Sequence, residues 1–93
     1  MRELPLPPIA QEIGAQEVLR VWSGDNLPQQ YALETTWQDP AAWGLLLADI
    51  ARHAARAYAA GSDVSERDAL ARIKIALDAE WNAPTDLGVR ADG

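Results

Sequence analysis

The sequence predicts an α+β protein in which a β-hairpin is followed by two α-helices, a ββαα order with the helices packed on one side of a small antiparallel sheet. Two observations lead to this fold class. Short stretches rich in β-branched and aromatic residues flank a cluster of turn residues in the first third of the chain. Two longer stretches with helical periodicity follow, and each begins with a capping signal.

The hairpin is predicted from two strand-like stretches. Residues 17–23, EVLRVWS, carry valine and tryptophan side chains of high β-propensity, and residues 31–36, YALETT, supply the returning strand. Residues 23–26, SGDN, are typical of a turn because they tolerate positive φ. Because Pro28 cannot donate a ladder hydrogen bond, we expect pairing to begin after it, which leaves a loop of several residues.

The first helix is predicted over residues 40–60 from signals at both ends. Asp39 is a favoured N-cap, and Pro40 suits the first helical position. The two signals support each other, because a residue before proline is pushed out of the helical region, as an N-cap must be. Gly61 is expected to end the helix by adopting the left-handed conformation.

The second helix is predicted to begin after Ser65 and to end at Trp81 or Asn82. Ser65 and Asp68 have the spacing of a capping box, in which the serine hydroxyl accepts a backbone N–H of the first turn. Pro84 prevents a long continuation because it lacks the N–H that a helix interior needs.

The predicted organisation is a single α+β domain over residues 17–82, an extended proline-rich arm over residues 1–16 and a flexible tail over residues 83–93. Residues 4–8, LPLPP, favour polyproline geometry. Their PxxP spacing has two interpretations. The arm is either a ligand for a partner domain or, as we favour, a stiff segment that lies on this protein or on a neighbouring copy.

Composition excludes several classes of function. The net charge is −6, which disfavours nucleic acid and anionic membranes as partners, because both require a basic face. The chain has no cysteine, so disulfides, thiolate chemistry and cysteine-type zinc sites are excluded. No stretch approaches the roughly 20 apolar residues that cross a bilayer, and the first residues do not resemble a secretion signal, so a cytoplasmic location is expected.

The first helix carries two neighbouring stripes. The helical period of 100° per residue places on one face the apolar residues Trp43, Leu46, Leu47, Ile50, Ala54, Ala57 and Tyr58, predicted to face the core. Beside it runs a row of small residues: Gly44, Ala48, Ala51, Ala55 and Ala59. A small-residue row lets another helix approach closely. That helix is either the second helix, with its stripe of Leu70, Ile73, Leu77 and Trp81, or the same helix of another subunit.

Self-association is predicted from an excess of apolar surface. On the first strand, Leu19 and Val21 point to one face while Val18 and Trp22 point to the other, and a half-exposed hairpin should avoid apolar side chains on both faces. We therefore predict a homo-oligomer, a dimer or a dimer of dimers. Its candidate interface residues are Gly44, Ala48, Ala51, Ala55 and Trp22.

The candidates for chemistry are few. His53 is the only histidine and follows Asp49 by one helical turn, so the pair is either a surface contact or an oriented imidazole that could act in acid–base or metal chemistry. A metal site would need further ligands, and no spacing indicates them. We predict no catalytic, cofactor-binding or metal-binding residue. The expected function is a non-enzymatic, self-associating interaction or structural module. The alternative is a small-ligand-binding protein or enzyme with a pocket near Trp43, Asp49 and His53 at a protomer interface.

The segment DPAAWGLLLADIARH, residues 39–53, together with LPLPP, EVLRVW and RIKIALDAEWN, resembles a family of small bacterial proteins classed as domain of unknown function 5076. The likeness covers residues 3–82. The resemblance implies an uncharacterised protein, and it supplies no activity or catalytic residues.

Overall fold

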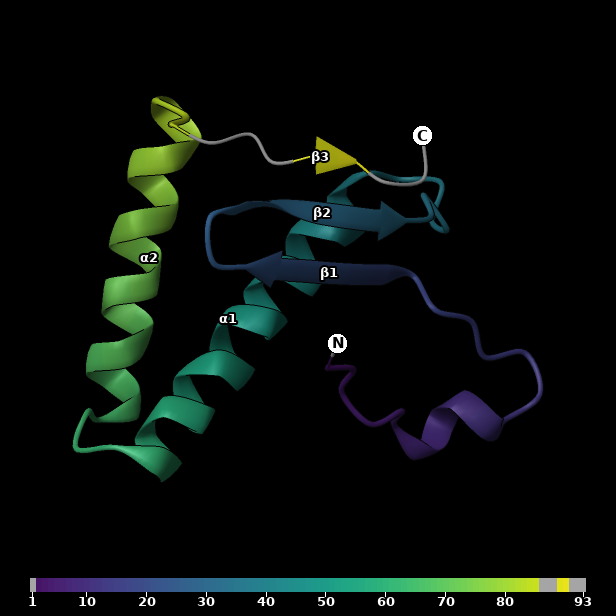
Figure 1. Cartoon of the computed structure of the whole chain (residues 1–93), viewed down its shortest axis with the longest axis horizontal. Coiled ribbons are helices and arrows are strands. Elements are labelled where there is room, and N and C mark those ends of the chain that lie inside the picture. The colour runs from purple at the N-terminus through teal and green to yellow at the C-terminus, as the bar shows by residue number, and fades with distance from the viewer. Residues whose placement is uncertain (1, 86–88, 91–93) are drawn as a thin grey trace. The chain divides into compact units, whose positions relative to one another are not determined.

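The computed structural model describes residues 2–85 and the backbone of residues 89–90. Its elements are, in order, η1 (Pro8–Gln11), β1 (Leu19–Gly24), β2 (Leu27–Leu33), α1 (Ala41–Gly61), α2 (Glu66–Asn82) and β3 (Val89–Arg90) (Figure 1). A hairpin followed by two helices confirms the predicted ββαα order and the α+β class. The chain divides into two compact units, Met1–Thr36 with Gly88–Gly93, and Trp37–Leu87. The assignment of residues 17–82 to a single domain stays a prediction.

The hairpin closes more tightly than the sequence predicts. β1 and β2 are antiparallel, and their last pair, Gly24 with Leu27, leaves a two-residue turn at Asp25 and Asn26. Asn26 has a φ of 59°, in the left-handed region that asparagine tolerates. The turn-forming residues are therefore those predicted, but the loop is two residues long and not several.

The prediction that pairing begins after Pro28 is wrong, because β2 already starts at Leu27. The register shifts between Trp22 and Gly24, so that β2 places one residue more than β1 between two successive pairs. Pro28 lies in this irregularity, where the ladder is already interrupted and a missing N–H is tolerated.

A third strand joins the sheet from the C-terminal end. β3 runs parallel to β2, with Gln30 opposite Val89 and Tyr31 opposite Arg90, and the strand order is β1–β2–β3. The sequence does not predict this two-residue strand, because so short a stretch has no periodicity to detect. The rest of the predicted tail beyond Thr85 lies outside the described residues.

The N-terminal arm combines an extended stretch with one turn of helix. Pro7 has φ −68° and ψ 153°, which is polyproline geometry as predicted for residues 4–8. The 3₁₀ turn η1 follows directly and was not predicted, and Ala10 donates its N–H to the Pro7 carbonyl at 2.9 Å. Arg20 of β1 pairs with Glu17 at 3.0 Å and with Glu3 at 3.9 Å, so the start of the arm lies beside β1.

Helix α1 begins at Ala41, one residue later than predicted, and it also ends differently. The Asp39 carboxylate accepts the N–H of Ala41 at 2.9 Å and stabilises the first turn, with Pro40 in the cap position. Gly61 was expected to be left-handed, but it is the last helical residue and has no positive φ. The Ser62 hydroxyl donates to the Tyr58 carbonyl at 2.7 Å, so a side chain satisfies the helix end in place of a glycine turn.

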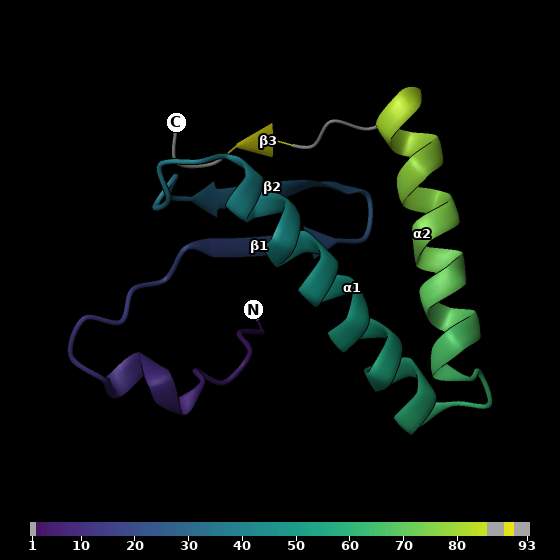
Figure 2. The ribbon, with the colours of Figure 1, turned by 180° about the vertical axis from the view of Figure 1, so that it is seen from behind.

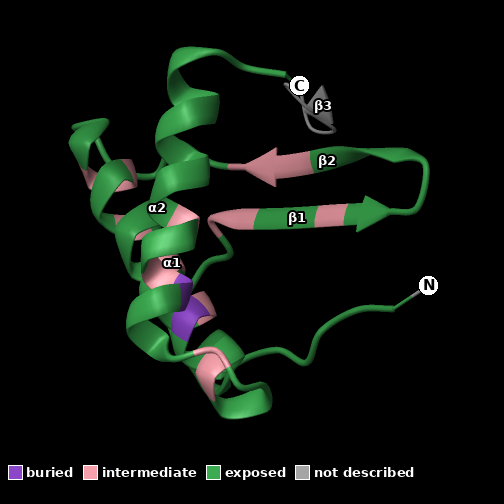
Figure 3. Ribbon diagram, turned by 90° about the vertical axis from the view of Figure 1, so that its left-hand side faces the viewer, coloured by how far each residue is buried: buried purple, intermediate pink, exposed green. Residues whose placement is uncertain are grey.

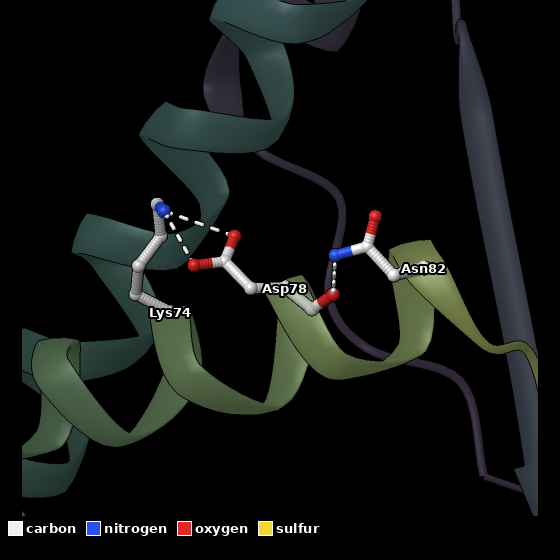
Figure 4. A network of polar contacts seen from close by, with 3 residues as sticks. All are labelled: Lys74, Asp78 and Asn82. Atoms are coloured by element: carbon white, nitrogen blue, oxygen red, sulfur yellow. Dashed lines mark hydrogen bonds and ion pairs between the residues drawn. The ribbon is translucent and has the colours of Figure 1, made fainter.

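Helix α2 has the predicted limits. The Ser65 hydroxyl accepts the N–H of Asp68 at 3.1 Å, which confirms the N-cap, and the helix ends at Asn82. Lys74 Nζ donates to both carboxylate oxygens of Asp78, at 2.9 and 2.8 Å, and the Asn82 amide donates to the Asp78 carbonyl at 2.9 Å (Figure 4). These contacts join successive turns of α2 and stabilise its C-terminal half.

The core of the described residues is small. The buried apolar residues are Ala55, at 0% exposed, and Ala69, at 4%, one on each helix (Figure 3). The predicted core stripe of α1 is therefore wrong in part, because Leu47, Ile50 and Tyr58 are exposed. The small-residue row, and not the bulky stripe, supplies the buried position of α1, because only small side chains let two helices approach closely.

Substitutions at the C-terminal end of α1 should change the free energy of unfolding. A Cβ added at Gly61 would meet no atom within 4 Å, and the residue already has a helical conformation. We expect Gly61→Ala to raise the free energy of unfolding by about 0.5–1 kcal/mol, because alanine restricts the unfolded chain. Urea denaturation measures it, and a loss of stability would contradict the helical assignment. As a matched control, Ser62→Ala should lower stability by about 1 kcal/mol through the lost bond to Tyr58.

Candidate binding groove

The two helices form a hairpin that is closed at one end and open at the other. They leave the turn at residues 62–65 and diverge along their length, as Figures 1 and 2 both show. Near the turn, Ala55 and Ala69 are buried, and Arg56 Nε lies 3.7 Å from Glu66 Oε2. Methyl side chains at this end permit the close approach of the two helices.

A groove of about 810 Å³ lies between the diverging parts of α1 and α2. Its apolar lining comes from both helices: Trp43, Gly44, Leu47, Ala48 and Ala51 on α1, and Leu70, Ile73, Leu77 and Trp81 on α2. Pro40, Ala41, Arg52 and Lys74 complete the lining. The helical periods of both helices therefore aim apolar side chains at a space that α1 and α2 leave open between them.

The bulky side chains of the groove are accessible to solvent. Trp81, in the last turn of α2, is 75% exposed, and Leu47 and Leu77 are also exposed. Trp43 contacts Trp37, whose ring lies 5.9 Å away at 75° in an edge-to-face arrangement. Trp43 on one helix and Trp81 on the other give the groove two aromatic surfaces.

The charged groups of the lining are cations. Lys74 is engaged by Asp78, an exposed i,i+4 pair that contributes a few tenths of a kcal/mol (Figure 4). Arg52, one helical turn after Ala48, has no hydrogen-bond or ion-pair partner in the part of the chain that the structure describes. The guanidinium is therefore available to an anionic group that enters the groove.

The structure brings together three of the five candidate interface residues. Gly44, Ala48 and Ala51 line the groove, and a Cβ at Gly44 would meet nothing within 4 Å. Ala55 belongs to the same row but is fully buried, so a second copy could touch it only if the helices separated. Trp22 lies on β1, in the other compact unit.

The pocket predicted near Trp43, Asp49 and His53 does not form within one chain. Trp43 lines the groove, whereas Asp49 and His53 are exposed and do not line it. Among the described residues, no side-chain hydrogen bond or ion pair joins Asp49 to His53, and no cluster of three metal-binding side chains occurs. A pocket that a second protomer completes stays a prediction.

Sequence reasoning missed Arg52 as a groove residue. The signal was present, because Arg52 follows Gly44 by eight residues and Ala48 by four, which places it at the edge of the small-residue row. Charged residues on a helix are usually solvated, and only the path of α2 shows that this one borders an apolar space.

The chain belongs to the family described as Domain of unknown function (DUF5076), whose model matches residues 3–85 and confirms the resemblance seen in the sequence. No curated protein matches the chain. A solved structure from the photosynthetic bacterium Rhodopseudomonas palustrus CGA009, described as a "putative pyruvate dehydrogenase", is similar to it, with 45% identity and a TM-score of 0.73. The match covers 92% of this chain and 89% of that one. In the described part, no helix has the length and hydropathy to cross a membrane.

A side chain larger than that of Ala55 should destabilise the closed end of the helix hairpin. We expect Ala55→Leu to lower the free energy of unfolding by about 1–3 kcal/mol, because Ala55 is fully buried and the added atoms would force the helices apart. Ala60→Leu, at an exposed position of the same helix, is the matched control and should change stability by less than about 0.5 kcal/mol. Equal effects of the two substitutions in thermal denaturation would contradict the close approach at Ala55.

Proposed function

We propose that the protein is a non-enzymatic, self-associating module and that its α1–α2 groove is the surface through which copies bind one another. The observation that carries the proposal is the contrast between two buried alanines and an open groove lined by tryptophan, leucine and isoleucine. Covering a bulky apolar side chain contributes about 1.5–3 kcal/mol, so a partner on this groove supplies the burial that the described residues lack. A dimer or a dimer of dimers satisfies this requirement.

The composition of the lining supports binding in preference to catalysis. Proton transfer needs a titratable group of suitable pKa beside the substrate, and the lining carries a guanidinium and an ammonium but no carboxylate, imidazole or hydroxyl. Tryptophan and arginine, by contrast, dominate the binding energy of protein interfaces. The 45% identical structure comes from a bacterium, which supports a bacterial origin, while the cytoplasmic location remains a prediction.

Self-association is tested by substituting one tryptophan. Trp81 and Ile75 are both on α2 and similarly exposed, at 75% and 70%, but only Trp81 lines the groove. We expect a dimer at micromolar concentration, which Trp81→Ala weakens about tenfold or more while Ile75→Ala leaves its dissociation constant unchanged. Sedimentation velocity measures both. A monomeric wild-type chain, or equal effects of the two substitutions, would contradict the proposal.

The alternative is a small-ligand-binding protein or enzyme, with a pocket near Trp43, Asp49 and His53 completed by a second protomer. The groove volume of about 810 Å³ lies in the range of ligand sites, and Arg52 and Lys74 would suit a carboxylate. The related structure described as a "putative pyruvate dehydrogenase" makes pyruvate the probe to use.

Thermal denaturation separates the two functions. We expect millimolar pyruvate to leave the Tm unchanged, because so small an anion would leave the apolar lining uncovered. A saturable rise in Tm that Arg52→Ala or His53→Ala abolishes would favour the alternative. Sodium acetate at equal concentration controls for ionic effects.

A further inference from the structure

The N-terminal arm is a second apolar surface that its own unit leaves uncovered. Its bulky side chains have exposed fractions from 66% to 104%: Leu4, Leu6, Ile9 and Ile13. Its ion pair with the sheet, Glu3 to Arg20, measures 3.9 Å between exposed groups, and such pairs contribute little. Apolar side chains gathered in one exposed segment mark an interaction site, so the arm requires a partner surface.

The arm is already shaped for binding. Pro5, Pro7 and Pro8 restrict the backbone, and Pro7 has polyproline geometry directly before the 3₁₀ turn η1 begins at Pro8. A segment held in this conformation loses little entropy when it binds, and aromatic-lined grooves are the surfaces that recognise it. The groove between α1 and α2 has this character, with Trp43 on one helix and Trp81 on the other.

The small residues of α1 leave room for a narrow segment between the two tryptophans. Gly44, Ala48 and Ala51 are the small residues of the α1 wall, and a Cβ at Gly44 would have open space around it. The opposite wall ends at Trp81, in the last complete turn of α2.

The charged residues of the groove favour the arm of a second copy, and not the groove of a second copy, as the segment that occupies it. Two grooves packed face to face would enclose two unpaired Arg52 guanidinium groups in one apolar interface, which is unfavourable. The arm instead carries two carboxylates, Glu3 and Glu12, against one cation, Arg2. The Glu12 carboxylate has no partner among the described residues, and neither has the Arg52 guanidinium.

We propose that the proline-rich arm of one copy binds in the α1–α2 groove of a second copy, and that two copies exchange arms reciprocally. This inference rests on the proposed self-association and names the segment that fills the groove. Each chain offers one arm and one groove, so a reciprocal exchange satisfies both and closes the assembly as a twofold dimer.

Substitutions in the arm of the full chain test the proposal. The arm variant is Leu6→Ser with Ile9→Ser, and its matched control is Ala10→Ser with Gln11→Ser in the same segment. We expect the arm variant to raise the dimer dissociation constant about a hundredfold, because two bulky side chains lose their burial. The control should stay within about threefold. Sedimentation velocity measures both variants.

The outcomes separate this inference from the proposed function. A dimer that Trp81→Ala weakens but the arm variant does not would keep groove-mediated association and overturn the arm as its occupant. A monomeric wild-type chain would overturn both. Equal weakening by the arm variant and its control would also overturn the role of the apolar side chains.

Disulfide trapping places the arm directly, because the chain has no cysteine of its own. A chain with Leu6→Cys is mixed with a differently tagged chain that carries Gly44→Cys, or Ile75→Cys as the control outside the groove. We expect the mixed disulfide to form several-fold more with Gly44→Cys. Equal yields would overturn the proposal. In a further experiment, Leu6→Cys and Gly44→Cys are placed in the same chain. A disulfide that forms only within single chains would also overturn the proposal, because it would show the arm in its own groove.

Discussion

The close approach of α1 and α2 at Ala55 and Ala69 is the contact on which the rest of the helical unit depends. Two methyl side chains fix the closed end of the hairpin and hold the backbones together there. The same choice of residues has a cost, because alanine buries little apolar area. The bulky residues of both helices lie farther along, where the helices have already diverged, so they line a groove and do not fill a core.

The parts of the fold that local signals determine could be predicted from the sequence. Asp39 and Ser65 bind backbone N–H groups within three residues, and these contacts form whatever surrounds the helix. The predictions for Gly61 and Pro28 are wrong, because in each case a neighbouring feature determines the local backbone. Ser62 satisfies the helix end in place of a glycine turn, and a register irregularity tolerates the proline.

The candidate groove could be predicted only in part. Periodicity indicated both the small-residue row and the α2 stripe of Leu70, Ile73, Leu77 and Trp81, but it could not decide which face of α1 meets α2. The two faces differ by less than half a turn of the helix, and the choice depends on the path of the loop at residues 62–65. The position of Arg52 at the edge of the groove could not be predicted for the same reason, because it depends on which part of α2 lies opposite this residue.

A groove lined by two tryptophans and several aliphatic side chains couples association to stability. Whatever covers the lining removes apolar surface from water in the folded chain and not in the unfolded one, so it stabilises the fold by mass action. The unpaired cation at Arg52 limits which surfaces can do this, because a cationic surface would be repelled while an acidic, apolar one would be attracted. Shape, apolar lining and charge therefore constrain the partner together, and the lining and the charge both come from side chains that α1 and α2 leave exposed.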